Sequence, residues 1–183
     1  MILKTKRLIL RPLKESDANS IVQNIDNLEV SKWLLVVPYP YARKDALFWI
    51  RSKKRKKKSQ IDCTFGIELK SEKAIIGAMG LHKVDRYQGC AEVGYWLGKR
   101  HHRQGYGSEA LKVLIDFSFN KLKLRRLEAG VFTGNPSSGK LLEKFGFKRE
   151  GLKVKARRSK ADGQIKDEIF YGLLKENYAK SNH

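Results

Sequence analysis

One stretch decides the fold: AEVGYWLGKRHHRQGYGSEA, residues 91–110. Its first part, Ala91–Leu97, alternates along the chain and predicts a strand. Its last part opens a helix over about 105–121, whose apolar residues recur at helical spacing: Ala110, Leu111, Leu114, Ile115 and Phe119. The glycine-rich loop between them exposes backbone N–H groups at the positive end of the helix dipole. This arrangement predicts a pyrophosphate site.

The loop composition agrees with an anion site. Gly105 and Gly107 let the backbone approach a ligand closely. Side chains that can carry positive charge would surround that ligand: Arg100, Arg103, His101 and His102. The alternative is an ordinary surface helix that begins with a turn.

Two nucleotide-binding motifs fit less well. Gly105–Ala110 matches the dinucleotide pattern, but the segment Lys99–Gln104 separates it from its strand, and Glu128 lies near the start of the next strand rather than its end. Gly134–Leu141 nearly forms a P-loop, yet Leu141 stands where magnesium binding needs a hydroxyl. Both interpretations are therefore disfavoured.

Outward from this stretch, periodicity predicts alternating strands and helices. The expected strands are residues 7–11, 63–69, 74–81, 91–97, 127–133, 147–156 and 165–174. The expected helices are residues 16–25, 45–58, 105–121 and 137–145. Ala161-Asp162-Gly163 favours a hairpin turn between the last two strands. The order predicts an α+β fold with a mixed, mostly antiparallel sheet and one strand–helix–strand crossover.

Length and composition predict a single domain over residues 1–183, because domains typically run to ~100–200 residues. No apolar run approaches the ~20 residues of a membrane span. Charge interrupts Met1–Arg7, so it does not read as a signal peptide, and we expect a cytoplasmic protein without a membrane partner. Cys63 and Cys90 are isolated and predict neither a disulfide framework nor a metal site.

The charge is strongly positive: 39 Lys and Arg face 19 Asp and Glu, a net charge of +20. Such a field attracts polyanions, including nucleic acid and ribosomes. The alternative is a compositional drift toward lysine that creates no binding site.

Three parts of the sequence together resemble the GNAT superfamily of acetyl-CoA-dependent N-acetyltransferases. They are the strand and loop quoted above, Thr5-x-Arg7-Leu8-x-Leu10-Arg11, and Asn135-x-x-Ser138-x-x-Leu141-Leu142-Glu143-Lys144-Phe145-Gly146-Phe147. The resemblance covers nearly the whole chain and ends at Asp167-x-x-x-Tyr171-x-Leu173-Leu174. It is nearest to the branch that acetylates ribosomal-protein N-termini. It implies a twisted sheet of about seven strands with four or so helices on both faces, and acetyl-CoA without a metal.

The resemblance also implies which residues hold acetyl-CoA. The strand before the loop splays from its neighbour, and its backbone pairs with the pantetheine arm through Tyr95, Trp96 and Leu97. The loop supplies Arg103, Gln104, Gly105, Tyr106, Gly107 and Ser108. Asn135 either binds the pantetheine arm or caps a helix. His102 departs from the Gln or Arg usual in the family, which backbone contacts should tolerate.

Acetyl transfer needs a neutral amine, a donor for the oxyanion and a proton for the thiolate. Glu92 stands where some family members hold a base carboxylate; the alternative is a rim carboxylate paired with Lys. Leu142 replaces the general-acid tyrosine of many relatives, which excludes a tyrosine mechanism at that position. Ser138 is the candidate contact to the CoA sulfur, against an ordinary serine in the first helical turn.

The acceptor side rests on aromatic residues. Trp33, Tyr39 and Tyr41 lie where the family builds its acceptor pocket, with Glu92 beside them; the alternative is packing of a long loop. For His82 we expect a structural role.

These expectations combine in an N-acetyltransferase that moves the acetyl group directly to a primary amine in a ternary complex. The favoured acceptor is a protein N-terminal amine, as on a ribosomal protein, and a small-molecule amine is the alternative. A non-catalytic nucleic-acid-binding protein, using Arg51–Lys58 and Lys153–Lys160, is the rival from another class. We expect electrostatic association with the ribosome, and a monomer or homodimer.

Overall fold

The computed structural model describes residues 1–54 and 63–181. The expected helix over 45–58 and the basic segment Arg51–Lys58 are therefore seen only as far as residue 54, and residues 55–58 lie outside the described residues.

Strands and helices alternate along the chain. The strands are β1 (Leu3–Lys4), β2 (Leu8–Arg11), β3 (Cys63–Leu69), β4 (Ala74–Asp85), β5 (Cys90–Leu97), β6 (Arg126–Phe132), β7 (Lys148–Arg158) and β8 (Ile165–Leu174). The helices are α1 (Ala18–Ile25), α2 (Leu28–Ser31), α3 (Arg43–Lys54), α4 (Tyr106–Asp116), α5 (Pro136–Lys144) and α6 (Lys175–Ser181).

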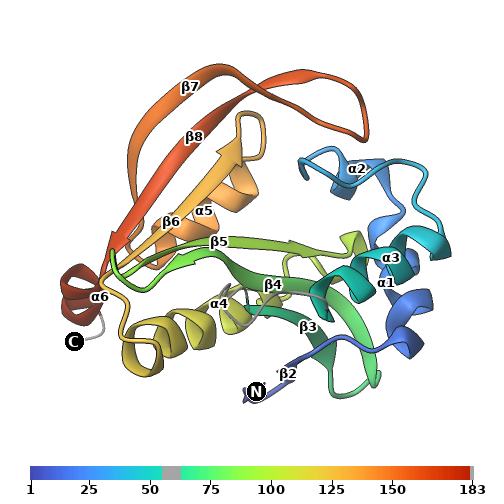
Figure 1. Cartoon of the computed structure of the whole chain (residues 1–183), viewed down its shortest axis with the longest axis horizontal. Coiled ribbons are helices and arrows are strands. Elements are labelled where there is room, and N and C mark those ends of the chain that lie inside the picture. Colours follow the sequence, from blue (N-terminus) through green and yellow to red (C-terminus); the bar gives the residue numbers. More distant parts are fainter. Residues whose placement is uncertain (55–62, 182–183) are drawn as a thin grey trace.

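The strands form one sheet in the order β1-β2-β3-β4-β5-β6-β8-β7. All neighbours are antiparallel except β5 and β6, which are parallel and joined by the crossover through α4. The α+β expectation is confirmed, with eight strands in place of about seven because the short strand β1 pairs with β2. Figure 1 shows β6, β8 and β7 rising away from β5, so the sheet opens in the middle like a V.

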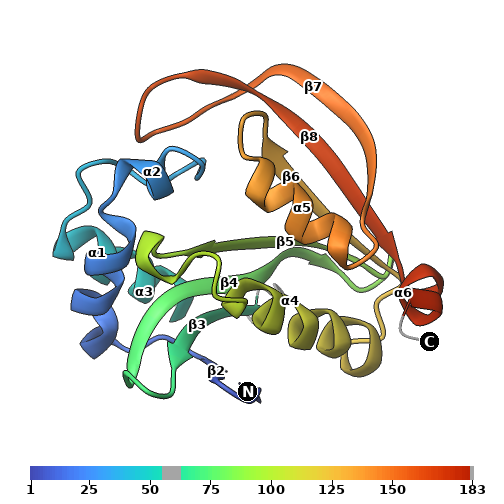
Figure 2. The same cartoon turned by 180° about the vertical axis from the view of Figure 1, so that it is seen from behind.

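Helices cover both faces of the sheet (Figure 2), as expected. One core, here called the α4-side core, joins the sheet to α4 and α5 through residues such as Leu111, Ile115 and Leu142. The other, the α1-side core, joins it to α1 and α3 through residues such as Ile21, Ile50 and Trp96. Within the described residues, no helix is long and apolar enough to cross a membrane.

The element boundaries differ from the expected ones in a few places. The strand expected over 74–81 runs on to Asp85, so His82 lies inside β4 rather than at its end. The helix expected over 105–121 is α-helical only to Asp116, and Phe117–Lys121 form a wider π-helical turn. Helices α2 and α6 were not predicted, because each is too short to show a clear helical periodicity of apolar residues.

The β7–β8 hairpin reaches across the sheet to the segment after α2. Gly163, with φ of 69°, supplies the left-handed residue of its turn, as the Ala161-Asp162-Gly163 pattern predicted. Lys160 N donates to Leu35 O at 3.2 Å, and Lys166 Nζ donates to Lys32 O at 2.6 Å. The β7–β8 hairpin is therefore hydrogen-bonded to the segment that follows α2, on the α1-side face of the sheet.

Candidate active site

The centre of the site is the place where two parallel strands stop pairing. β5 and β6 pair only between Cys90–Glu92 and Arg126–Glu128, and beyond Glu92 and Glu128 they separate. We call this separation the split. The expectation that the strand before the loop splays from its neighbour agrees with this geometry.

Beyond Glu92, the backbone of β5 directs toward the split groups that pair with no strand. Gly98 N donates to Ile76 O of β4 at 2.9 Å, and backbone groups alternate sides along a strand. Tyr95 and Leu97 therefore direct their N–H and C=O groups toward the split. Trp96, expected to contribute its backbone, directs that backbone toward β4, and its side chain lies in the α1-side core.

The glycine loop leads from β5 into α4 with two left-handed residues, Arg103 (φ 61°) and Gly105 (φ 81°). The backbone N–H groups of Gly105–Ser108 donate no hydrogen bond to any described residue, as expected for a first helical turn. These donors point out of the helix start and suit the oxygens of a pyrophosphate. Arg103 and Gln104 lie exposed beside them.

A side-chain staple that the sequence reasoning missed holds this helix start in place. Arg7 donates from Nε to Glu109 Oε2 at 2.7 Å and from Nη1 to Gln104 O at 2.9 Å. Thr5 Oγ1 donates to Glu109 Oε1 at 2.5 Å. Burial opposes ionisation of Glu109, but hydrogen bonds from Thr5 and Arg7 outweigh it and lower its pKa. The Thr5-x-Arg7 motif contains the two residues of this contact. The sequence alone did not show that their partner is Glu109.

The prediction of four positive side chains around the loop is partly wrong. His101 is buried, and this burial lowers its pKa, so its imidazole stays neutral at physiological pH. Arg100 donates to His101 Nε2 at 2.9 Å and pairs with Glu72 at 3.3 Å, which turns its guanidinium toward the β3–β4 turn. His102 Nε2 lies 2.9 Å from Leu97 O. Of the two expected arginines, Arg103 is the one that stays beside the loop, where the Arg7 guanidinium also lies.

On the other side of the split, the start of α5 meets β5. Asn135 is the N-cap of α5, and its side chain accepts from Ser138 N at 3.4 Å, so the capping alternative is present in the structure. Ser138 Oγ lies 2.8 Å from Tyr95 Oη. Burial raises the pKa of Tyr95 to about 12, although the hydrogen bond with Ser138 opposes the rise. This phenol therefore stays protonated at physiological pH.

Glu92 lies at the closed end of the split on the α1-side face. It is the Cα partner of Glu128 across the parallel pair and of His82 across β4. Its Oε2 accepts from Lys83 Nζ at 2.7 Å, and its side chain is 38% exposed. The ion pair with Lys, foreseen as the alternative, is thus present, and it leaves the carboxylate accessible.

The three expected acceptor aromatics lie in different surroundings. Trp33 faces the loop before α5, since a Cβ on Gly134 would lie 3.2 Å from its ring, and Lys166 Nζ lies 5.0 Å from the ring centroid. Tyr39 is 45% exposed. Tyr41 is buried in the α1-side core, where burial raises its pKa to about 12. Its expected substrate contact is corrected to core packing of the loop.

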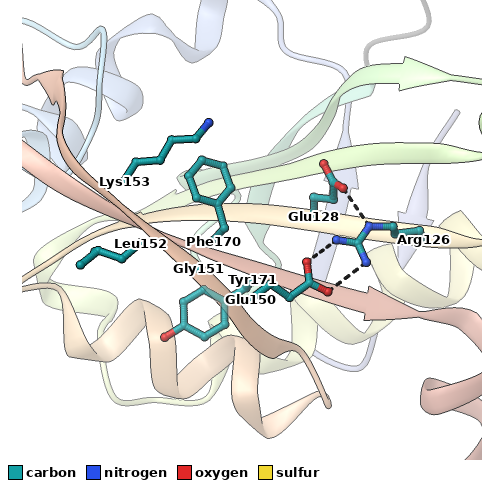
Figure 3. Close-up of a pocket in the computed structure, with 8 residues that line it drawn as sticks. All are labelled: Arg126, Glu128, Glu150, Gly151, Leu152, Lys153, Phe170 and Tyr171. Atoms are coloured by element: carbon teal, nitrogen blue, oxygen red, sulfur yellow. Dashed lines mark hydrogen bonds and ion pairs between the residues drawn. The ribbon is translucent and has the colours of Figure 1, made fainter.

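A cavity of about 360 Å³ lies beside the closed end of the split (Figure 3). Its wall contains Arg126, which donates to Glu128 at 2.8 Å and to Glu150. Phe170 and Lys153 complete the part that faces the α1 side, with Lys153 Nζ 4.3 Å from the ring centroid. The sequence reasoning named none of these residues as lining a pocket, because strand register brings them together. Arg126 already pairs with both carboxylates of this wall, so we assign the cavity no role.

The split, the free loop donors and the start of α5 occur together in one enzyme family. The family described as "Acetyltransferase (GNAT) domain" matches residues 7–148. The chain belongs to this family. It is therefore a GNAT N-acetyltransferase, and the nucleotide-binding interpretations of its glycine motifs are set aside.

Similar proteins agree with this assignment, one of them over nearly the full length. The chain is 35% identical to "Uncharacterized N-acetyltransferase p20" of Bacillus licheniformis over 179 residues, which cover 97% of this chain and 98% of that protein. It is 34% identical over 80 residues to the "Ribosomal-protein-serine acetyltransferase" of Escherichia coli, covering 44% and 45% of the two chains. Among solved structures, that of "Mycobacterium smegmatis RimJ in complex with CoA-disulfide" has a TM-score of 0.80 at 23% identity, covering 92% of this chain and 82% of that one.

Acetyl-CoA is the acyl donor of GNAT enzymes, and the residues at the split fit it. The unpaired N–H groups of Gly105–Ser108 suit its pyrophosphate, and the β5 backbone at Tyr95 and the N–H of Leu97, which pair with no strand, suit its pantetheine arm. The Leu97 carbonyl is 2.9 Å from His102 Nε2. A Cβ on Gly107 would lie 3.3 Å from Leu141 and 3.4 Å from Leu97, so only a small residue keeps this entrance open. No group of metal-ligating side chains occurs among the residues that the structure describes.

Proposed function

We propose that this enzyme acetylates a protein N-terminal amine, of the kind presented by ribosomal proteins, by direct transfer within a ternary complex. The observation that carries the proposal is the split, with a hydroxyl pair on one side and carboxylates on the other. Its helix-covered α4 side holds the Tyr95–Ser138 pair, and its α1-side face carries Glu92.

On the donor side, Ser138 donates a hydrogen bond to the leaving thiolate and stabilises its charge. The Tyr95 hydroxyl, whose pKa burial raises to about 12, lies 2.8 Å from Ser138 Oγ and 3.2 Å from Ser138 O. In the proposed transfer Tyr95 donates to Ser138 Oγ, and Ser138 directs its own hydrogen toward sulfur. A phenol thus reaches this position from β5, although α5 carries Leu142 where many relatives have a tyrosine. Tyr95 acts here as a positioning residue.

On the acceptor side, Glu92 takes the proton of the incoming amine, directly or through one water. The amine nitrogen forms its bond to the thioester carbonyl carbon, and the bond from that carbon to sulfur breaks. Backbone N–H groups of β5 at the split stabilise the charge that develops on the carbonyl oxygen. Glu92 receives the amine proton and releases it to solvent, and the thiolate, held by the hydrogen bond from Ser138, takes up a proton from solvent as CoA leaves. The step therefore balances without a covalent enzyme intermediate.

The acceptor class rests on the relatives and on charge. One matched protein bears the name of a ribosomal-protein-serine acetyltransferase, and the net charge of +20 draws the enzyme toward ribosomal RNA. The same charge repels free polyamines. Both features favour a protein N-terminus over a small polycation.

The test is an acceptor screen with acetyl-CoA and mass-spectrometric product analysis. Peptides that begin with Ser or Ala are compared with the same peptides blocked at the N-terminus and carrying an internal lysine, and with small amines. We expect acetylation at the α-amine of the free peptides only. Acetylation confined to lysine or to small amines would overturn the acceptor assignment while leaving the transferase intact.

A further inference from the structure

Two glycines stand at the same level on the two edges of the split. Gly94 and Gly130 each follow by two residues the paired positions Glu92 and Glu128, and they share the α1-side face with them. Neither glycine has a side chain. On the α1 side, the entrance to the split is therefore bordered by side chains from the neighbouring strands β4 and β8.

Each glycine is covered by one titratable side chain. On the β5 edge, a Cβ on Gly94 would lie 3.1 Å from Cδ2 and 3.2 Å from Nε2 of His82, which comes from β4. On the β6 edge, a Cβ on Gly130 would overlap Oε1 of Glu168, which comes from β8. His82 and Glu168 therefore border the same opening from its two sides.

The carboxylate of Glu168 is poorly satisfied where it lies. Its side chain is only 15% exposed, and its buried Oε2 accepts no hydrogen bond from the described residues. Arg157 Nε is 3.6 Å away, an ion pair that is too long for a hydrogen bond. Oε1, the oxygen beside Gly130, likewise accepts no hydrogen bond from the described residues. A little-exposed carboxylate without a donor is costly, which favours a ligand that brings a donor to Oε1.

Other nearby cations are directed away from Glu168. Lys153 lies over the ring of Phe170 at 4.3 Å. Lys166 donates to Asp162 Oδ2 and to Lys32 O, each at 2.6 Å. Arg157 thus lies beside the buried Oε2, and Oε1, the oxygen next to Gly130, is the one that faces the split.

We propose that Glu168 is an acceptor-binding residue, whose carboxylate receives the positively charged amine at the edge of the split opposite His82. This inference rests on the proposed transfer to an amine and adds a second carboxylate to it. Glu168 holds the ammonium at the entrance, and Glu92, at the closed end, accepts its proton. Gly130 is required because any side chain there would displace the carboxylate from the edge.

The experiment uses CoA thioethers whose tail crosses the split from the donor side, so it needs no knowledge of the natural acceptor. Calorimetry compares a series of S-aminoalkyl thioethers with S-alkyl thioethers of equal length. We expect the wild-type protein to prefer an amine tail by about five- to tenfold in Kd, as for one charge-assisted hydrogen bond. Glu168→Gln should abolish that preference while leaving the affinity for the alkyl series unchanged.

Two further variants make the result specific. Gly130→Ala keeps the charge but shifts the carboxylate, and it should also reduce the preference. Glu150→Gln removes a carboxylate of the β7–β8 hairpin that is tied to Arg126, and it should leave the preference intact. Thermal melting shows that each variant is folded.

The inference is overturned if wild type binds both series equally, if Glu168→Gln retains the preference, or if Glu150→Gln loses it equally. Failure of every thioether to bind would instead reject the acetyl-CoA site itself, and the proposed function and this inference would fall together.

Discussion

At the residue scale, the proposed chemistry on the donor side depends on the pair Tyr95–Ser138. The two hydroxyl oxygens are 2.8 Å apart, and burial raises the pKa of the phenol to about 12. A serine hydroxyl that accepts a hydrogen bond from Tyr95 keeps its own hydrogen for another acceptor. We propose that Ser138 hydrogen-bonds to the thiolate in this way and that Tyr95 orients it.

Ser138→Ala should lower kcat more than Tyr95→Phe does, because the proposal gives the serine the direct contact with the substrate. Losing one neutral hydrogen bond from Tyr95 should lower kcat about two- to tenfold. The double variant should be no slower than Ser138→Ala alone, because the tyrosine acts through the serine. Steady-state rates of the three variants test this, and additive losses would show that the two residues act independently.

Glu92→Gln should lower kcat about a hundredfold or more if the carboxylate is the general base. Its affinity for acetyl-CoA, measured by calorimetry, should not change. Lys83→Met, which removes the partner of the ion pair, is the matched control and should keep most of the activity. Equal, small losses in both variants would instead assign Glu92 to a rim ion pair.

At the element scale, the start of the chain serves the cofactor loop. The segment from Thr5 to Arg7 holds Glu109 in the first turn of α4, and Arg7 also binds the carbonyl of Gln104. The guanidinium lies 4.4 Å from the centroid of the Tyr106 ring. These contacts fix the direction of the free N–H groups before any ligand binds.

Arg7→Ala should therefore weaken acetyl-CoA binding about tenfold, because the loop loses its fixed orientation. Lys6→Ala removes the same charge from an exposed neighbouring position and should change the affinity little. Calorimetric titration of both variants distinguishes the staple from a general effect of charge. Equal affinities in the two variants would contradict this role of Arg7.

Local pattern was enough to predict the strand, loop and helix at the centre of the site, since their spacing lies within one continuous segment. It was not enough for contacts made by register between distant segments. Tyr95 meets Ser138, Arg7 meets Glu109, and Glu168 covers Gly130 only once the sheet order is known. His101 was misjudged for the same reason, because its burial comes from the packed structure.

At the scale of the whole molecule, one hydrophobic core packs against each face of the sheet. Each contains a tyrosine whose pKa burial raises to about 12: Tyr95 beside the α4-side core and Tyr41 in the α1-side core. The folded state thus binds these two phenolic protons more tightly than the unfolded chain, whose tyrosines have the ordinary pKa of 10.0.

The free energy of unfolding should therefore be unaffected by these groups below pH 10.0 and should fall as the pH rises from there toward about 12. Thermal melting across the alkaline range measures this slope. Tyr41→Phe should make the slope shallower, since one of the two groups is removed. A slope identical to that of wild type would show that Tyr41 does not contribute.

The most direct test of the account is calorimetric titration of acetyl-CoA into wild type, Gly107→Ala and Gly107→Trp. A Cβ just fits between Leu141 and Leu97, whereas an indole fills the entrance to the free N–H groups. The account predicts micromolar binding by wild type, binding within about tenfold of it by the alanine variant, and none by the folded tryptophan variant. Wild-type affinity in folded Gly107→Trp would contradict the assignment of acetyl-CoA to this loop.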